Sequence, residues 1–261
     1  TGRGFYERVV QILATVQEAE EFVSSGHERA GGSLRITAPI GFARLHIAPH
    51  LYDFMRQYPE VHLDIIATDH FLDIVREGID VAVRISELED SSMVARKLAP
   101  CQRVFCASPA YLKEHGEPQN LDDLSSHKIL AENNVTWRLQ GPDGVTSLKP
   151  ASDLKTNSSD IVHQAAVAGC GIAWRSTWQV RDDLLNKKLV PILHQYRATP
   201  GLAVYAVYPD KQFVPARLRV FVDFLAGIYG PEPYWDAGLD LRPLRTPKKK
   251  RSAVVPVAAQ A

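Results

Sequence analysis

The chain has 261 residues, 45% of them hydrophobic, which is enough to bury one large core or two modest ones. Its 30 Lys and Arg side chains balance 30 Asp and Glu side chains, so the overall charge lacks the basic excess of most nucleic-acid-binding domains. No stretch approaches the roughly 20 apolar residues of a membrane span, and the charged first residues do not resemble a signal peptide, which predicts a cytoplasmic protein without membrane contact. Three cysteines without CxxC spacing predict packed, reduced thiols rather than disulfides or structural zinc.

Residues 1–29 carry apolar side chains at alternating spacings of four and three, with charged residues between them, which is the pattern of a heptad seam on one long helix. The alternative is an amphipathic helix that lies on its own domain, and the pattern does not decide between them. If the seam pairs with a second copy, the chain forms a homodimer or a tetramer. The predicted dimerisation residues are Phe5, Val9, Ile12, Val16 and Val23.

The next segment has the pattern of a βαβ unit. A short β run at Leu34 to Ala38 is followed by a turn at Pro39 to Phe42, a helical apolar face up to Tyr58, and an alternating strand from Val61 to Ile65. Pro49 fits best in the first turn of the helix, because proline has no amide hydrogen to donate. A right-handed crossover of this kind predicts a parallel sheet.

The remaining elements predict a second lobe of the same design. Further β runs lie at 80–85, 93–98 and 103–107, after a short helix at 73–77. The second lobe then has a hairpin turn at 141–144 and a strand, helix and strand at 154–156, 159–168 and 171–174. A strand at 202–208 and a helix at 214–229 return to the first lobe. The predicted divisions are a linker helix at 1–29, lobe I at 33–106 plus 203–229, lobe II at 107–202, and a disordered tail at 230–261.

The order and spacing of these pieces resemble the LysR-type transcriptional regulators, over a stretch from Thr1 to about Leu241. The resemblance implies an α/β effector domain with the two-lobed, periplasmic-binding-protein-like (type 2) fold, preceded by a dimerising linker helix. Regulators of this kind begin with a winged helix-turn-helix, which this chain lacks, so promoter DNA is expected to be bound only through a missing N-terminal domain. The matching residues are Phe5 to Arg8, Gly32 to Ile36, Ala38-Pro39, Tyr58 to Val61, Gly78 to Arg84, Ala107 to Leu112, Trp137-Arg138, Ala168 to Ala173 and Pro233 to Trp235.

Ligands of open α/β sheets lie beyond the carboxyl ends of the strands, where helix N-termini carry a partial positive charge. Two predicted helix starts, Pro39 to Phe42 and Asn157-Ser158, suit a small anion, and by resemblance the effector is an organic acid between the lobes. Arg84 can instead form an ion pair with Asp64 or Asp80. Asn157 and Ser158 can simply cap their own helix. Arg175 stands where relatives commonly have a Leu-Pro pair. The candidate effector-binding residues are Pro39, Ile40, Gly41, Phe42, Asp69, His70, Arg84, Asn157, Ser158 and Arg175.

No motif indicates catalysis. The chain has no GxSxG elbow, GxGxxG turn, P-loop or HExxH pair, so we expect neither an enzyme nor a cofactor. His46 and His50 have a zinc-compatible spacing, but Pro49 lies between them and no third ligand is near, so we expect no metal. The resemblance therefore implies the sensing and oligomerising part of a transcription regulator. The alternative is a solute-binding protein of a transport system, which has the same two-lobed design.

Overall fold

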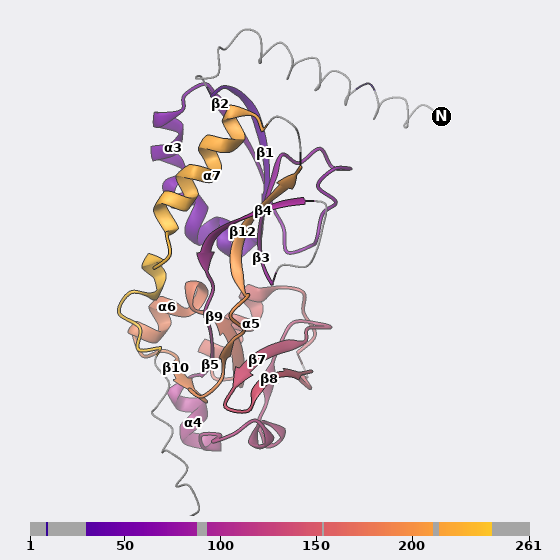
Figure 1. Ribbon diagram of the computed structural model, residues 1–261. Coiled ribbons are helices and arrows are strands. Elements are labelled where there is room, and N and C mark those ends of the chain that lie inside the picture. The colour runs from indigo at the N-terminus through magenta and orange to yellow at the C-terminus, as the bar shows by residue number, and fades with distance from the viewer. Residues whose placement is uncertain (1–8, 10–29, 88–92, 153, 211–213, 242–261) are drawn as a thin grey trace, which may run out of the picture.

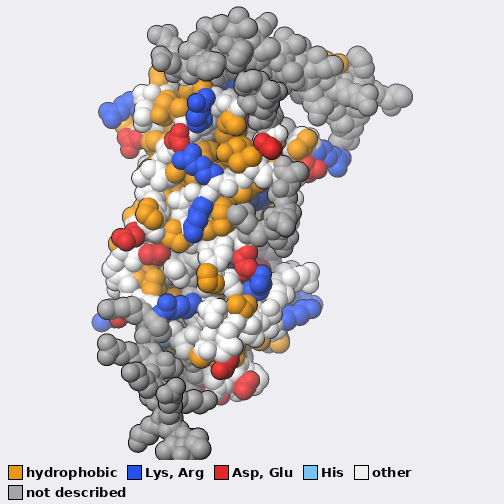
Figure 2. All heavy atoms as spheres, in the orientation of Figure 1, with side chains coloured by type: hydrophobic (Ala, Val, Ile, Leu, Met, Phe, Trp, Pro, Cys, Tyr) orange, Lys and Arg blue, Asp and Glu red, His pale blue; other side chains and the backbone are white. Residues whose placement is uncertain are grey.

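A computed structural model describes residue 9 and residues 30–87, 93–152, 154–210 and 214–241. Two lobes are stacked along the long axis of the molecule (Figure 1). Of the predicted dimerisation helix, only Val9 belongs to the described residues, so pairing through this helix stays a prediction. On the face shown in Figure 2, acidic and basic side chains of the described residues are intermixed, as the balanced composition suggested.

Lobe I contains a five-stranded mixed sheet in the order β2-β1-β3-β12-β4. The predicted parallel βαβ unit is present, because β1 pairs in parallel with β2 and with β3. Strand β12, from the returning chain, lies between β3 and β4 and is antiparallel to both. The strands are β1 (Gly32–Ala38), β2 (Val61–Ala67), β3 (Val81–Ser86), β4 (Met93–Pro100) and β12 (Ala203–Pro209).

The helical connection between β1 and β2 starts earlier than predicted. It begins with α2 (Ile40–Phe42), continues through a π-helical turn (Ala43–Ile47) and a 3-10 turn (Ala48–His50), and ends with α3 (Leu51–Gln57). Pro49 therefore lies inside the helical run instead of in its first turn. The change to a 3-10 turn at this point agrees with the missing amide hydrogen of proline. The Pro39 to Phe42 turn is thus the N-terminus of the helical run.

Helix α7 (Ala216–Tyr229) covers the same sheet beside α3 (Figure 1). Its apolar residues at three- and four-residue spacing, including Leu218, Phe221 and Leu225, are each at most 5% exposed. They pack in one core with Phe54 of α3 and the inner residues of the strands. At about 1.5–3 kcal/mol for each large apolar side chain, this burial stabilises lobe I.

Lobe II contains a four-stranded sheet in the order β10-β5-β9-β6 and a three-stranded sheet in the order β11-β7-β8. The predicted Gly141 to Gly144 turn joins β7 to β8 in an antiparallel hairpin. The strands are β5 (Arg103–Ala107), β6 (Ile129–Leu130), β7 (Trp137–Gly141), β8 (Gly144–Leu148), β9 (Ile172–Ser176), β10 (Val190–Ile192) and β11 (Arg197–Ala198). The helices are α4 (Pro109–His115), α5 (Ser159–Val167) and α6 (Thr177–Leu185).

Two predicted features of this lobe need correction. Strand β5 pairs with β9 and β10, so the chain leaves the first sheet at Cys101–Gln102 and not near residue 106. Residues 154–156 form no strand; the parallel neighbour of β9 is β6, and Ser152 adds an isolated bridge to Ile129. In lobe I, the short helix expected at 73–77 is a single turn, in which Glu77 N donates to the Asp73 carbonyl over 3.0 Å.

The segment after α7 is ordered where we predicted a disordered tail. Residues Tyr234–Asp236 form a 3-10 turn, and Trp235 is fully buried. The tail prediction is thus wrong for residues 230–241, and residues 242–261 lie outside the described part of the chain. Among the described residues, no helix has the length and apolar content needed to cross a membrane.

Candidate functional site

The two predicted helix starts face each other where the lobes meet. A Cβ atom added at Gly41, in the first turn of α2, would lie 3.2 Å from Oδ1 of Asp160 and 3.6 Å from the Trp178 ring. Asp160 belongs to the first turn of α5, and Trp178 belongs to α6, so lobe I contacts two helices of lobe II through a glycine. Arg44 adds an ion pair across the lobes, 3.6 Å from Asp160.

The start of α2 already has an anionic partner. Ile40 N donates to Oδ1 of Asp69 over 3.1 Å, so one predicted ligand residue caps another. His70 is exposed, and its backbone N–H donates to the Thr68 hydroxyl over 3.1 Å. Phe42 is fully buried in the aromatic core and is therefore a packing residue. Its ring lies 5.4 Å from the ring of Trp178.

The start of α5 is likewise occupied by protein groups. The Ser158 hydroxyl accepts from Ile161 N over 3.4 Å, which is the predicted N-cap. Asn157 is exposed. The Asp160 carboxylate lies in the first turn, where it offsets the partial positive charge of the helix end, and it accepts from Nε2 of Gln179 over 3.0 Å. Both helix starts therefore carry a carboxylate of the chain itself.

Arg84 does not pair with Asp64 or Asp80, the alternatives considered from the sequence. Its Nη2 donates to the Leu72 carbonyl over 3.0 Å, and its guanidinium lies over the ring of Phe71, 4.6 Å from the centroid. Phe71 is 83% exposed, so this cation–π contact is an outer one. Burial lowers the pKa of Arg84 from its ordinary value.

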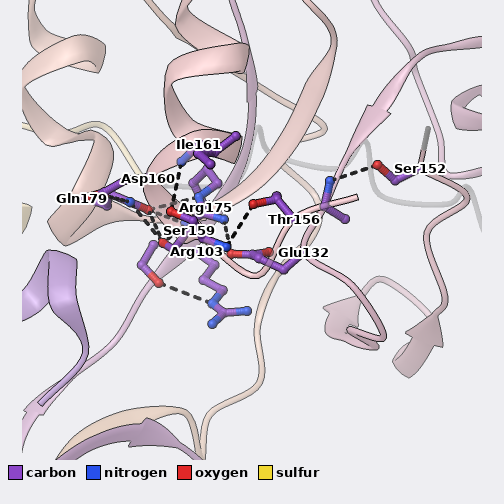
Figure 3. A network of polar contacts seen from close by, with 12 residues as sticks. Arg103, Glu132, Ser152, Thr156, Ser159, Asp160, Ile161, Arg175 and Gln179 are labelled. Atoms are coloured by element: carbon purple, nitrogen blue, oxygen red, sulfur yellow. Dashed lines mark hydrogen bonds and ion pairs between the residues drawn. The ribbon is translucent and has the colours of Figure 1, made fainter. Parts of the chain in front are cut away.

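Arg175 is the centre of a buried polar network (Figure 3). Its side chain is 7% exposed, and its Nη1 forms an ion pair with Glu132 over 2.7 Å. Its Nε donates to Gln179 over 3.0 Å, and its Nη2 contacts Ser159 and Gln179. Burial alone would raise the pKa of Glu132, but the charge and hydrogen bond of Arg175 hold that pKa below its ordinary value. Arg175 is therefore engaged within the protein through all three of its nitrogens.

Arg103 is a basic residue that the sequence analysis did not select. It is partly buried at the first position of β5, directly after the chain enters lobe II. Its Nε donates to the Ser176 hydroxyl over 3.3 Å. Among the described residues, its Nη1 and Nη2 have no hydrogen-bond or ion-pair partner. No sequence signal singled it out, because the predicted crossing lay near residue 106 and its position after the crossing follows only from the pairing of β5 with β9 and β10.

An aromatic cluster joins the lobes on the side of α6. His46, from the π-helical turn of lobe I, is 4% exposed. Its Nε2 lies 3.0 Å from the Trp178 carbonyl and its Nδ1 lies 2.7 Å from the Tyr234 hydroxyl. The Trp235 ring lies 4.6 Å from the His46 ring. Both ring nitrogens are thus occupied by other protein groups, and no group of three potential metal ligands occurs among the described residues.

The cysteines are unpaired. Cys101 and Cys106 are buried, Cys170 is exposed, and none of the three forms a disulfide among the described residues. Burial raises the pKa of Cys106 to about 12, so this thiol stays protonated at neutral pH. Cys101 donates a weak hydrogen bond to the Ser176 hydroxyl over 3.6 Å, which also accepts from Arg103.

Two lobes joined by two crossings, with polar groups where they meet, define the class of periplasmic-binding-protein-like effector domains. A family model described as the LysR substrate binding domain matches residues 27–228. The chain therefore belongs to the LysR-type transcriptional regulator family, as its regulatory domain, and the relatives reported below are regulators and not enzymes.

Two curated relatives come from Escherichia coli K12. The transcriptional activator TtdR is 35% identical over 231 residues, which are 87% of this chain and 74% of the relative. The regulator DmlR is 34% identical over 229 residues, covering 86% of this chain and 74% of the relative.

Two solved structures of LysR-type regulators have a similar fold. The regulatory domain of CrgA from Neisseria meningitidis matches with a TM-score of 0.68 and 29% identity, over 77% of this chain and 100% of that one. A full-length AphB variant matches with a TM-score of 0.71 and 27% identity, over 87% of this chain and 78% of that one. The predicted fold class is confirmed.

Proposed function

We propose that this domain binds a small effector between its lobes and that binding changes how the lobes sit relative to each other. The observation that carries the proposal is the direct contact of the two helix starts across the lobes, at Gly41 and Asp160. A molecule that enters there touches both lobes at once. A ligand shifts the balance between two arrangements of the lobes only if it binds one of them more tightly. A ligand that touches both lobes has such a difference in affinity, because its contacts change when the lobes move.

The output of the shift is transcription control. The linker residues Phe5, Val9, Ile12, Val16 and Val23 are proposed to pair two copies, and DNA-binding domains of the parent regulator bind the promoter. The effector then alters the geometry of the pair and so the engagement of the operator. The effector is proposed to be a small organic acid, and the protein is proposed to work in the cytoplasm.

The candidate contacts need revision in light of the geometry. Ile40, Gly41, Asp160 and the neighbouring Asn157 lie where an effector would reach both lobes. Phe42 belongs to the core of lobe I and is a packing residue beneath this surface, not a ligand contact. His70 follows Asp69, the partner of Ile40 N, and Arg84 donates to Leu72 of the same loop; both are proposed as outer contacts.

Thermal-shift screening tests this proposal. A collection of small organic acids and matched neutral compounds is added to the 261-residue chain, and the unfolding midpoint is measured. We expect at least one compound to raise the midpoint in the wild type but not in a Gly41→Leu variant, whose side chain would press against Asp160 and Trp178 and so change the contact between the helix starts. Hits that shift both proteins equally would contradict binding between the lobes.

A further inference from the structure

We propose that Arg103, and not a helix N-terminus or Arg175, is the residue that takes the acid group of the effector. The inference rests on the proposed function, because it names the contact within the same interlobe site. Arg103 lies two residues after Cys101, which is part of the core of lobe I, and it begins the first strand of lobe II. Its side chain therefore starts at the seam between the lobes.

The geometry of its guanidinium leaves one edge open. The Nε atom donates to Ser176, which fixes the plane of the group at one end. The Nη1 and Nη2 atoms, which together present the fork that fits two oxygens of a carboxylate, have no partner among the described residues. A partly buried arginine with this edge unpaired is poorly satisfied by the protein alone.

The nearby charges do not neutralise Arg103. Register places Arg103 opposite Ser176 and Arg175 opposite Val104, so the two arginines leave opposite faces of the sheet. The Glu132 carboxylate forms its ion pair with Arg175 over 2.7 Å. Burial lowers the pKa of Arg103, and the charge of Arg175 acts in the same direction, while Cys101 and Glu132 oppose it. Asp160, the other carboxylate of this network, is paired with Arg44. Arg103, Arg175 and Glu132 then leave one positive charge, which suits one singly charged acid group.

The other cationic candidates are already used. Each guanidinium nitrogen of Arg175 has a protein partner, and Arg84 is held by the Leu72 carbonyl and the Phe71 ring. The starts of α2 and α5 carry Asp69 and Asp160. An incoming carboxylate would have to displace these groups, whereas at Arg103 it displaces only solvent.

The first test compares three charge-removing variants in buffer with only chloride as the anion. The Arg103→Met variant should unfold at the same temperature as the wild type or higher, because the cation that it removes has only the long hydrogen bond from Nε to Ser176 among the described residues. The Arg175→Met variant should unfold at a lower temperature, because it leaves Glu132 and Gln179 without their cation. The exposed Arg219→Met variant, on α7, controls for the change in net charge.

The second test titrates acetate, benzoate and phosphate against chloride at matched ionic strength, with acetamide and benzamide as neutral counterparts. The midpoints of the wild type and of Arg219→Met should rise saturably with at least one of these anions, by about 3 °C at a tenfold excess over Kd. Arg103→Met should lose this rise, and the neutral counterparts should give none.

Two results would overturn the inference. One is an unfolding temperature of Arg103→Met as low as that of Arg175→Met, which would make Arg103 structural. The other is an anion-specific rise that Arg103→Met retains, or no such rise in the wild type up to about 50 mM anion. If neutral compounds bind between the lobes in the wild type, the proposed function stands and only this inference fails; if no compound binds there, the proposed function fails as well.

Discussion

The free energy of unfolding should decrease as the pH is lowered, because of His46, which joins the two lobes. The Trp178 carbonyl can only accept, so Nε2 of the neutral ring carries the hydrogen and donates it. The Nδ1 atom then accepts from the Tyr234 hydroxyl. Burial is the main cause that lowers the pKa of His46 to about 4, and the charge of His50 acts in the same direction. The hydrogen bond to Trp178 and the charge of Asp182 oppose it.

The sign and size of the effect follow from this pKa. Because the pKa is about 4 in the folded state and 6.5 in the unfolded state, the unfolded chain binds more protons between these values. The contribution of His46 is therefore fully present above about pH 6.5 and is lost as the pH falls toward 4. At 1.36 kcal/mol per pKa unit, the loss from about pH 7.5 to about pH 5 is about 2 kcal/mol.

Denaturant unfolding at a series of pH values measures this loss. The difference in free energy of unfolding between the wild type and His46→Gln should change by about 2 kcal/mol over that range, because only the wild type carries the titrating ring. His62→Gln, at an exposed position on β2, is the matched control and should follow the wild type. If His46→Gln keeps the full pH dependence of the wild type, the assignment of the titration to His46 is refuted.

Three substitutions test the packing within lobe II and between the lobes. Arg175→Met should cost about 3–5 kcal/mol in free energy of unfolding. The double variant with Glu132→Gln should cost clearly less, because the second change removes the carboxylate that has lost its cation. Equal costs of the single and double variants in urea unfolding would contradict the buried ion pair. Trp235→Ala should cost about 3–5 kcal/mol, measured in the same way, and a cost near zero would show that the segment after α7 does not pack. Gly171→Ala should lower the thermal midpoint strongly, because its Cβ would lie 2.4 Å from the Lys128 carbonyl oxygen, whereas Gly227→Ala, with open space around it, should not.

The regular elements of the fold were predictable because their patterns are local. Alternation in Val61 to Ile65 and the three- and four-residue spacing in α7 report directly which face is buried. The misplaced features depend on distant partners. Residues 154–156 have strand-forming composition, but β6 takes the position beside β9. Trp235 lies in a segment without periodicity and packs against His46 and Phe42, which are far from it in the chain.

The candidate site shows the same division. Sequence reasoning placed two helix starts near each other, because strand–helix junctions of α/β lobes share one edge of the sheet. It did not show that Asp69 and Asp160 lie at these starts, nor that Glu132 pairs with Arg175 over 43 positions of the chain. Arg103 was missed for the converse reason: its interest lies in the partners it lacks, and only the three-dimensional structure shows these.

Hydrogen exchange with and without a compound found in the thermal-shift screen tests the central claim most directly. Binding between the lobes predicts that backbone amides become protected in both lobes together, at the start of α2 and at the starts of α5 and β5. Protection confined to one lobe would contradict the claim. Protection confined to the pocket of lobe I lined by Ile79, Tyr208 and Leu218 would be one such result.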